Sequence, residues 1–168
     1  MLDWVTRVAS PRAAIWANGD GPIPQRSFVT IKVDTVVREG HPTHFPLTDA
    51  GVLPIVQGAM LSVSVDVYGG RGREALSLAV VLSGSLNRVS VRERLRSYGL
   101  AFVDLPSAPA DVTEIVGTTH EGRARFDVRF RASLRDDDPV GWIETVELTG
   151  ELSSGAYDYT ETRIIGVT

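Results

Sequence analysis

The sequence of 168 residues contains no cysteine, a single lysine among its 17 basic residues, and no long apolar run. Without cysteine the chain can form no disulfide, no thiolate metal site and no thiol nucleophile. A transmembrane helix needs about 20 mostly apolar residues, so no membrane span or membrane partner is predicted. The first ten residues have neither a cationic start nor an apolar core, so we predict no signal peptide. The length is that of one domain.

Motifs that carry out catalysis are missing as well. The glycine cluster at residues 69–72 opens a predicted helix, as a phosphate-binding loop does. It lacks the Gly-Lys-Ser/Thr end of a nucleotide-binding P-loop and the full dinucleotide fingerprint, so we interpret these glycines as a tight turn. No nucleophile-elbow pattern is present. We therefore predict that the protein is not an enzyme and holds no cofactor.

No set of side chains has the spacing of a metal site. The residues considered for one are the three histidines with two nearby carboxylates: His41, His44, His120, Asp49 and Glu121. The pair spaced by three lies in a proline-rich segment without a regular scaffold to orient it. The acidic turn at residues 136–138 lacks the length and flanking ligands of a calcium loop. We predict no metal.

Charge is distributed unevenly along the chain. Residues 1–135 carry 16 basic and 13 acidic side chains, for a net charge of +3, whereas residues 136–168 carry one basic and eight acidic, for −7. The acidic end is either a solvated segment or a surface for a partner, and two copies could associate head to tail.

Alternating apolar residues predict the long strands, at residues 27–38, 59–68, 121–135 and 141–152. Shorter strands are predicted at 13–17 and 100–105, and helices at 2–9, from about 76 to 86, and from 90 to 98. Because the helices lie between groups of strands, we predict an α+β fold, a mainly antiparallel sheet with helices packed on one face.

The stretch at residues 51–86 organises this prediction, because a strand there breaks sharply into a helix. One side of the strand should be buried, with the residues Ala59, Leu61, Val63, Val65 and Val67. The helix should bury a stripe formed by Leu76, Ala79, Val80 and Ser83, widened by Leu78, Leu82 and Leu86. In the next helix, Ser90 and Glu93 form a capping-box pattern, and Gly99 is placed to end it.

The connections are less regular. Residues 39–54 contain three prolines and two glycines and are predicted to be a long loop, or a flexible flap that extends a hairpin. The strand at 141–152 is expected to pair with the strand at 121–135. Residues 1–154 are predicted to form a single domain, followed by an extended C-terminal tail at residues 155–168.

Four arginines on the polar side of the third long strand are the most prominent candidate surface. They are Arg123, Arg125, Arg129 and Arg131. They can pair with acidic residues on neighbouring strands, meet another subunit, or contact nucleic acid phosphates. The candidate partners within the chain are Asp34, Asp66, Glu144 and Glu151. The net acidity of the chain argues against a dedicated nucleic-acid binder.

Four segments together resemble the tail terminator or neck terminator proteins of tailed bacteriophages. They are IWANGDGPIPQRSFVTIKV, VDVYGGRGREAL, LRSYGLAFVDL and RARFDVRFRASL, within residues 13–150. The resemblance implies a virion structural protein that forms a homo-oligomeric ring, a hexamer, caps the tail tube and joins it to the head-neck connector. A head-completion protein, a tail-tube protein and a non-catalytic nucleic-acid-binding domain are the alternatives.

The resemblance also implies the partners and the contact surfaces. The expected partners are other copies of the chain, the tail tube protein, a neck or head-completion protein, and a sheath protein if the tail is contractile. DNA would only pass through the lumen, in a virion assembled in the host cytoplasm. The expected interface residues lie in the flap, the arginine row and the tail: His41, His44, Phe45, Arg123, Arg125, Arg129, Arg131, Tyr157 and Tyr159.

Overall fold

The computed structural model describes residues 1–24, 27–69, 73–116, 119–141, 145–154 and 157–166. The chain divides into two compact units. The first consists of residues 1–43 and 56–135, and the second of residues 44–55 and 136–168. The predicted α+β class with a mostly antiparallel sheet is confirmed.

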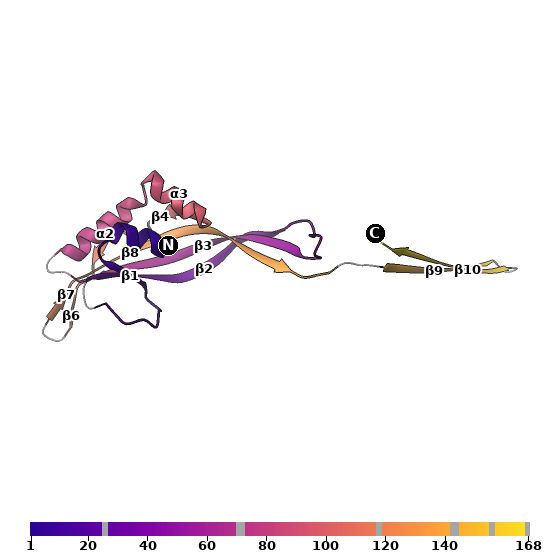
Figure 1. Ribbon diagram of the computed structural model, residues 1–168, viewed down its shortest axis with the longest axis horizontal. Helices are drawn as coiled ribbons and strands as arrows, with labels where there is room; N and C mark the ends of the chain where they lie inside the picture. Colours follow the sequence, from indigo (N-terminus) through magenta and orange to yellow (C-terminus); the bar gives the residue numbers. More distant parts are fainter. Residues whose placement is uncertain (25–26, 70–72, 117–118, 142–144, 155–156, 167–168) are drawn as a thin grey trace. The chain divides into compact units, whose positions relative to one another are not determined.

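A six-stranded sheet and three helices form the first unit (Figure 1). The sheet has the strand order β1-β2-β3-β8-β4, and β5 also pairs with β8. Only the β1–β2 pair is described as parallel. The bounds of the elements are α1 (Leu2–Ala9), β1 (Ala13–Trp16), β2 (Phe28–His44), β3 (Leu53–Tyr68), α2 (Glu74–Ser85), α3 (Val89–Ser97), β4 (Leu100–Asp104), β5 (Ala110–Asp111) and β8 (Arg123–Asp138). Strands β6 (Glu114–Val116) and β7 (Thr119–Glu121) form a separate small hairpin.

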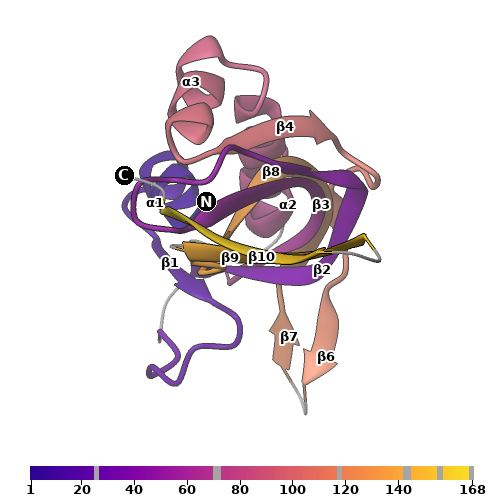
Figure 2. The ribbon, with the colours of Figure 1, turned by 90° about the vertical axis from the view of Figure 1, so that its right-hand side faces the viewer.

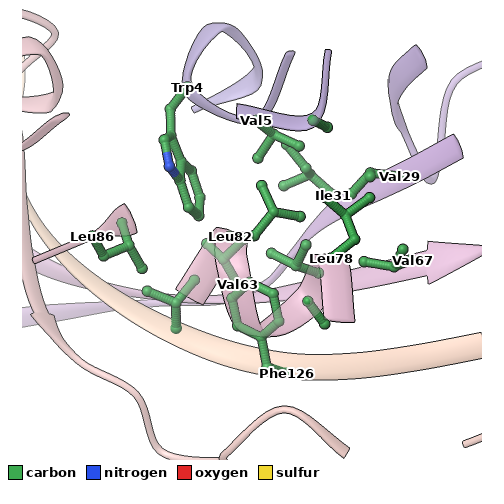
Figure 3. Close-up of a cluster of buried hydrophobic side chains, with 14 of the residues drawn as sticks. Trp4, Val5, Val29, Ile31, Val63, Val67, Leu78, Leu82, Leu86 and Phe126 are labelled. Carbon is green, nitrogen blue, oxygen red and sulfur yellow. The ribbon is translucent and has the colours of Figure 1, made fainter. Parts of the chain in front are cut away.

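The three helices lie on one face of this sheet, and the apolar core is between them and the strands (Figures 1 and 2). Alternate residues of β8 are fully buried, from Ala124 to Phe130. Figure 3 shows side chains from α1, α2, β2, β3 and β8 converging in this core. The residues predicted for the buried side of β3 are mostly buried, although Leu61 is half-buried. Among the described residues, no helix lies on the other face of the sheet, which we call the polar face (Figure 1).

One buried hydrogen bond joins α1 to α2. The indole N–H of Trp4 donates to Ser85 Oγ at 2.8 Å, and the Ser85 hydroxyl donates to the carbonyl oxygen of Leu82 at 2.6 Å. Trp4 also contacts Phe130 of β8 edge to face. The pair therefore satisfies the polar atoms that α1 and α2 bury in the apolar core.

The helices differ from the sequence prediction in two details. Val80 is half-exposed instead of buried, because the buried face of α2 is centred on Leu78 and Leu82. The helix α3 begins at Val89 with Arg88 as its N-cap, so Ser90 lies inside the helix and makes no capping bond. Gly99 has a φ of +74° directly after the end of α3, as a C-terminal stop requires. None of the described helices is long and apolar enough to cross a membrane.

Gly69 marks the end of β3. Its φ is +89°, and a Cβ atom added there would lie 2.7 Å from the Cα atom of Ser27. The turn therefore needs glycine both for its conformation and for the close approach of the neighbouring chain. Residues 70–72, the rest of the predicted glycine turn, lie outside the described residues.

The predicted loop at residues 39–54 is mostly strand. Strand β2 continues to His44 and β3 begins at Leu53, so only residues 45–52 connect them. This corrects the loop alternative and leaves a long hairpin. The alternating pattern of β2 ended, in our prediction, at Arg38, because Gly40 and Pro42 are unusual in strands. The Gln57 side chain of β3 donates to the carbonyl oxygen of Gly40 at 2.9 Å, which supports the strand at this point.

The second unit contains a two-stranded antiparallel sheet of β9 (Thr145–Ser154) and β10 (Tyr157–Gly166). Ten residue pairs are in register, from Tyr157 opposite Ser154 to Gly166 opposite Thr145. The partner predicted for residues 141–152 was wrong, because β9 pairs with β10 and not with β8. Residues 157–166 of the predicted extended tail form the second strand of this hairpin, and residues 155, 156, 167 and 168 lie outside the described part of the chain.

Candidate assembly interface

The four predicted arginines lie in a row along β8 on the polar face, since the alternate residues of β8 are buried in the core. Each forms an ion pair within the chain. The pairs are Arg123 with Asp66, Arg125 with Asp127, Arg129 with Asp104, and Arg131 with Glu39. Of the partners proposed from the sequence, Asp66 is confirmed for Arg123. Glu144 lies outside the described residues, and the side chain of Glu151 is not described.

The pair of Arg123 and Asp66 is the least exposed of the four. Two nitrogens of the guanidinium donate to Asp66 Oδ1, at 3.2 and 3.0 Å, and Asp66 is buried. The guanidinium also lies 5.0 Å from the centre of the Tyr68 ring, which stacks on Phe28. Hydrogen bonds to a charged group and a cation–π contact together fix the orientation of this side chain.

A β-bulge brings Asp104 to Arg129. Phe102 of β4 lies opposite Phe130, but Asp104 lies opposite Arg129, so Val103 is an extra residue on β4. Without this bulge Val103 would face Arg129, and Asp104 would be on the other side of the strand. Arg129 Nε donates to Asp104 Oδ1 at 2.7 Å, and a second nitrogen donates to Oδ2. The sequence prediction missed Asp104 because a regular strand would turn it away.

Two carboxyl groups on the polar face, those of Asp104 and Asp34, have a lowered pKa. The hydrogen bond from Arg129 is the main cause for the pKa of Asp104, and the positive charge of the guanidinium adds to it. For Asp34, the main cause of the lowered pKa is the hydrogen bond from Lys32, at 2.9 Å, with a smaller contribution from Ser64. Both groups are therefore held as carboxylates, and each neutralises a neighbouring cation.

Each basic side chain in the ion pairs of the polar face is matched by one acidic side chain. The basic residues in these pairs are Lys32 and the four arginines of β8, and the acidic ones are Asp34, Glu39, Asp66, Asp104 and Asp127. A polyanion such as DNA is attracted by a surface of one sign. Paired charges of both signs instead favour a defined, polar contact with a complementary protein surface.

A cavity of about 1190 Å³ lies on the polar face, between the sheet and the segment that follows β1. Its lining combines aromatic and apolar side chains with the charged pair at its floor: Trp16, Ile23, Phe28, Tyr68, Asp66 and Arg123. Ile23 is 74% exposed. Binding surfaces of proteins often combine apolar and charged side chains in this way, but the shape of the cavity alone identifies no ligand.

The predicted residues of the flap and tail fall in different places. His41 is an exposed residue of β2 in the first unit. His44 and Phe45 belong to the second unit, where the Phe45 N–H donates to the carbonyl oxygen of Pro54 at 2.9 Å. Tyr157 and Tyr159 lie on β10. Among the described residues, no group of three or more His, Asp or Glu side chains is arranged to hold a metal ion.

The sequence prediction also missed an unpaired strand edge. Strand β1 pairs with only the first four residues of β2, ending with Trp16 opposite Ile31. Among the described residues, no strand pairs with that side of β2 from residue 32 to residue 43, and we call this stretch the open edge. Val36 and Val37 on it are 51% and 58% exposed. The sequence did contain a signal for this edge: the short strand predicted at residues 13–17 is too short to cover the long strand predicted at residues 27–38.

A comparison with protein families identifies the chain's relation to a known family. A family model described as "Phage neck terminator protein" matches residues 2–155, which is most of the chain and includes every element from α1 to β9. No curated protein of similar sequence is found. The matched range contains both the polar face and the open edge.

Proposed function

The chain belongs to the family of phage neck terminator proteins, and from that premise we propose that it is a ring-forming subunit that caps the tail tube and joins it to the head. The ring is proposed to be a hexamer. The family match is the observation that carries this proposal, because neck terminators are structural components of the virion neck. The partners are the tail tube protein on one side and a neck or head-completion protein on the other.

The surfaces of the first unit support this role. A ring is built from head-to-tail contacts, in which each subunit uses two different surfaces. The chain offers an open edge, a neutral polar face with paired charges, and an acidic second unit. The contact residues proposed from the sequence remain the flap residues His41, His44 and Phe45, the arginine row, and the two tyrosines of β10.

The test is the state of assembly of the purified full-length chain. Light scattering should give a mass of six times the 18.2 kDa chain, and electron microscopy should show closed rings that bind the ends of tail tubes. Long filaments would instead indicate a tail-tube protein. A chain that stays monomeric at all concentrations and is absent from purified virions would contradict the proposal.

A second measurement tests the alternative that the polar face binds nucleic acid. If the polar face bound DNA, retention on DNA would fall with salt and would be lost in the double variant Arg125→Ala/Arg129→Ala. We expect no retention near physiological salt, because each of these arginines is already paired with a carboxylate.

A further inference from the structure

We propose that the β9–β10 hairpin of one copy of the chain adds to the open edge of β2 in the next copy, so that it continues the sheet of its neighbour. This inference deepens the proposed function and rests on it, because it assigns the contact that closes the ring. The pairing uses main-chain hydrogen bonds, as in other cases of strand addition to a sheet edge.

The open edge is the first observation that carries the proposal. Strand β2 is 17 residues long, and β1 covers four of them. The strand is long, and Val36 and Val37 on it are exposed. An unpaired strand edge presents main-chain N–H and C=O groups that can pair with another chain, and proteins usually cover or shorten such edges. Here nothing among the described residues covers residues 32–43, so we expect a second chain to do so.

The hairpin is the second observation. Among the described residues, β9 and β10 pair only with each other, over ten residue pairs. A two-stranded hairpin alone is at best marginally stable in water, and a third strand is normally needed. Strand β2 of a neighbouring copy would provide that strand. The ten residues of either hairpin strand fit along the twelve residues of the open edge.

Charge favours this contact between copies. The first unit carries 16 basic and 12 acidic side chains, for a net charge of +4, and the second unit carries one basic and nine acidic, for −8. On the open edge itself, Asp34 is paired with Lys32 and Glu39 with Arg131, whereas Arg38 forms no ion pair with a described residue. The open edge itself is neutral, since Lys32 and Arg38 balance Asp34 and Glu39, but the opposite net charges of the two units speed the approach of one copy to another.

Both the hairpin and the open edge belong to this chain, so a second copy can supply the hairpin that the edge receives. The contact is then head to tail. One subunit gives its hairpin and receives another hairpin on a different surface. Such a contact closes into a ring when the rotation between neighbours fits a whole number of subunits.

The test uses engineered cysteines, which is straightforward because the chain has none of its own. One cysteine replaces Val37 on the open edge. A second replaces either Thr162 on β10 or Thr149 on β9, which lie opposite each other in the hairpin. The full-length chains Val37→Cys/Thr162→Cys and Val37→Cys/Thr149→Cys are treated with a short bis-maleimide, which tolerates a shift of the strand register.

The expected result is a ladder of covalent multimers on a denaturing gel for at least one of the two chains. The stronger ladder identifies which hairpin strand is adjacent to β2. The matched control is Val81→Cys/Thr162→Cys, because Val81 is 48% exposed but lies on α2, away from the edge. A cross-link within single chains, a ladder equally strong in the control, or no cross-link in either chain would overturn the inference.

The mass of the unmodified protein in solution separates this inference from the proposed function. Rings without a cross-linked ladder would overturn the hairpin contact and leave the neck terminator proposal standing. A ladder of open chains without rings would support the contact and count against the ring. Neither a ladder nor rings would overturn both.

Discussion

Residues 28–31 of β2 and residues 32–38, which follow them, share one alternating pattern but have different surroundings. Val29 and Ile31 are fully buried under the helices and beside β1, whereas Val36 and Val37 are more than half exposed. All four are β-branched apolar residues, so what differs between them is the structure that covers them. The comparison indicates that an alternating pattern identifies a strand that other elements normally pair with or pack against. Those elements need not belong to the same chain.

Truncations on the two sides of this comparison should have the largest difference in effect. Phe126→Ala removes a fully buried ring from the core, and we expect a loss of about 3–5 kcal/mol in the free energy of unfolding. Val37→Ala should change the free energy of unfolding by less than about 0.5 kcal/mol, because the side chain is exposed in the single chain. Urea unfolding measures both.

The same Val37→Ala chain should assemble less well than the unaltered one. The control is Val81→Ala, which removes an equally exposed valine from α2. A large loss of stability in the monomeric Val37→Ala chain would contradict the view that this part of β2 is uncovered there.

Gly69 allows a second comparison, between a glycine that the fold requires and one that it does not. Gly69→Ala places a Cβ atom against Ser27 at a φ of +89°, and we expect a loss of about 1–3 kcal/mol in stability. Gly84→Ala lies in α2 with open space around it, and should gain about 0.5–1 kcal/mol through higher helix propensity. Thermal unfolding distinguishes the two, and equal effects would contradict the close approach at Gly69.

The apolar core also contains a hydrogen bond, between Trp4 and Ser85, that a substitution can remove. Ser85→Ala leaves the indole N–H of Trp4 buried without an acceptor, and we expect a loss of about 1–3 kcal/mol in the free energy of unfolding. Ser77→Ala, on the exposed side of α2, is the control and should change stability little. If both variants unfold alike, the Trp4–Ser85 bond does not support the core.

The charges of the polar face should give the smallest effect. The pKa of Asp104 is lower in the folded chain than the ordinary value of about 3.9, so its contribution to stability is present above that pH. The contribution is lost as the pH falls through the folded pKa. A carbon-detected NMR titration should show the Asp104 pKa returning toward its ordinary value in Arg129→Gln. It should stay low in Arg131→Gln, whose arginine pairs with Glu39 instead.

The long strands and the three helices could be predicted from the sequence because burial on one side of an element leaves a local pattern. The pairing of β9 could not, because residues 157–166 lack a regular alternation of apolar and polar side chains, so the sequence indicated only β8 as a partner. The pairing of Asp104 with Arg129 depends on one extra residue, Val103, that a regular strand does not have. The α3 cap failed because the helix begins at Val89, two positions before the capping box requires.

In the proposed ring, the shortness of β1 determines where a neighbour can attach. The segment after Trp16 leaves β2 and passes over the cavity on the polar face, instead of continuing along the strand. If residues 17–24 were redesigned to extend β1 along β2, the chain would cap its own edge. Such a subunit would still have its hairpin but would accept none. Mixed with unaltered subunits, it would act as a dominant inhibitor that stops a ring before it closes.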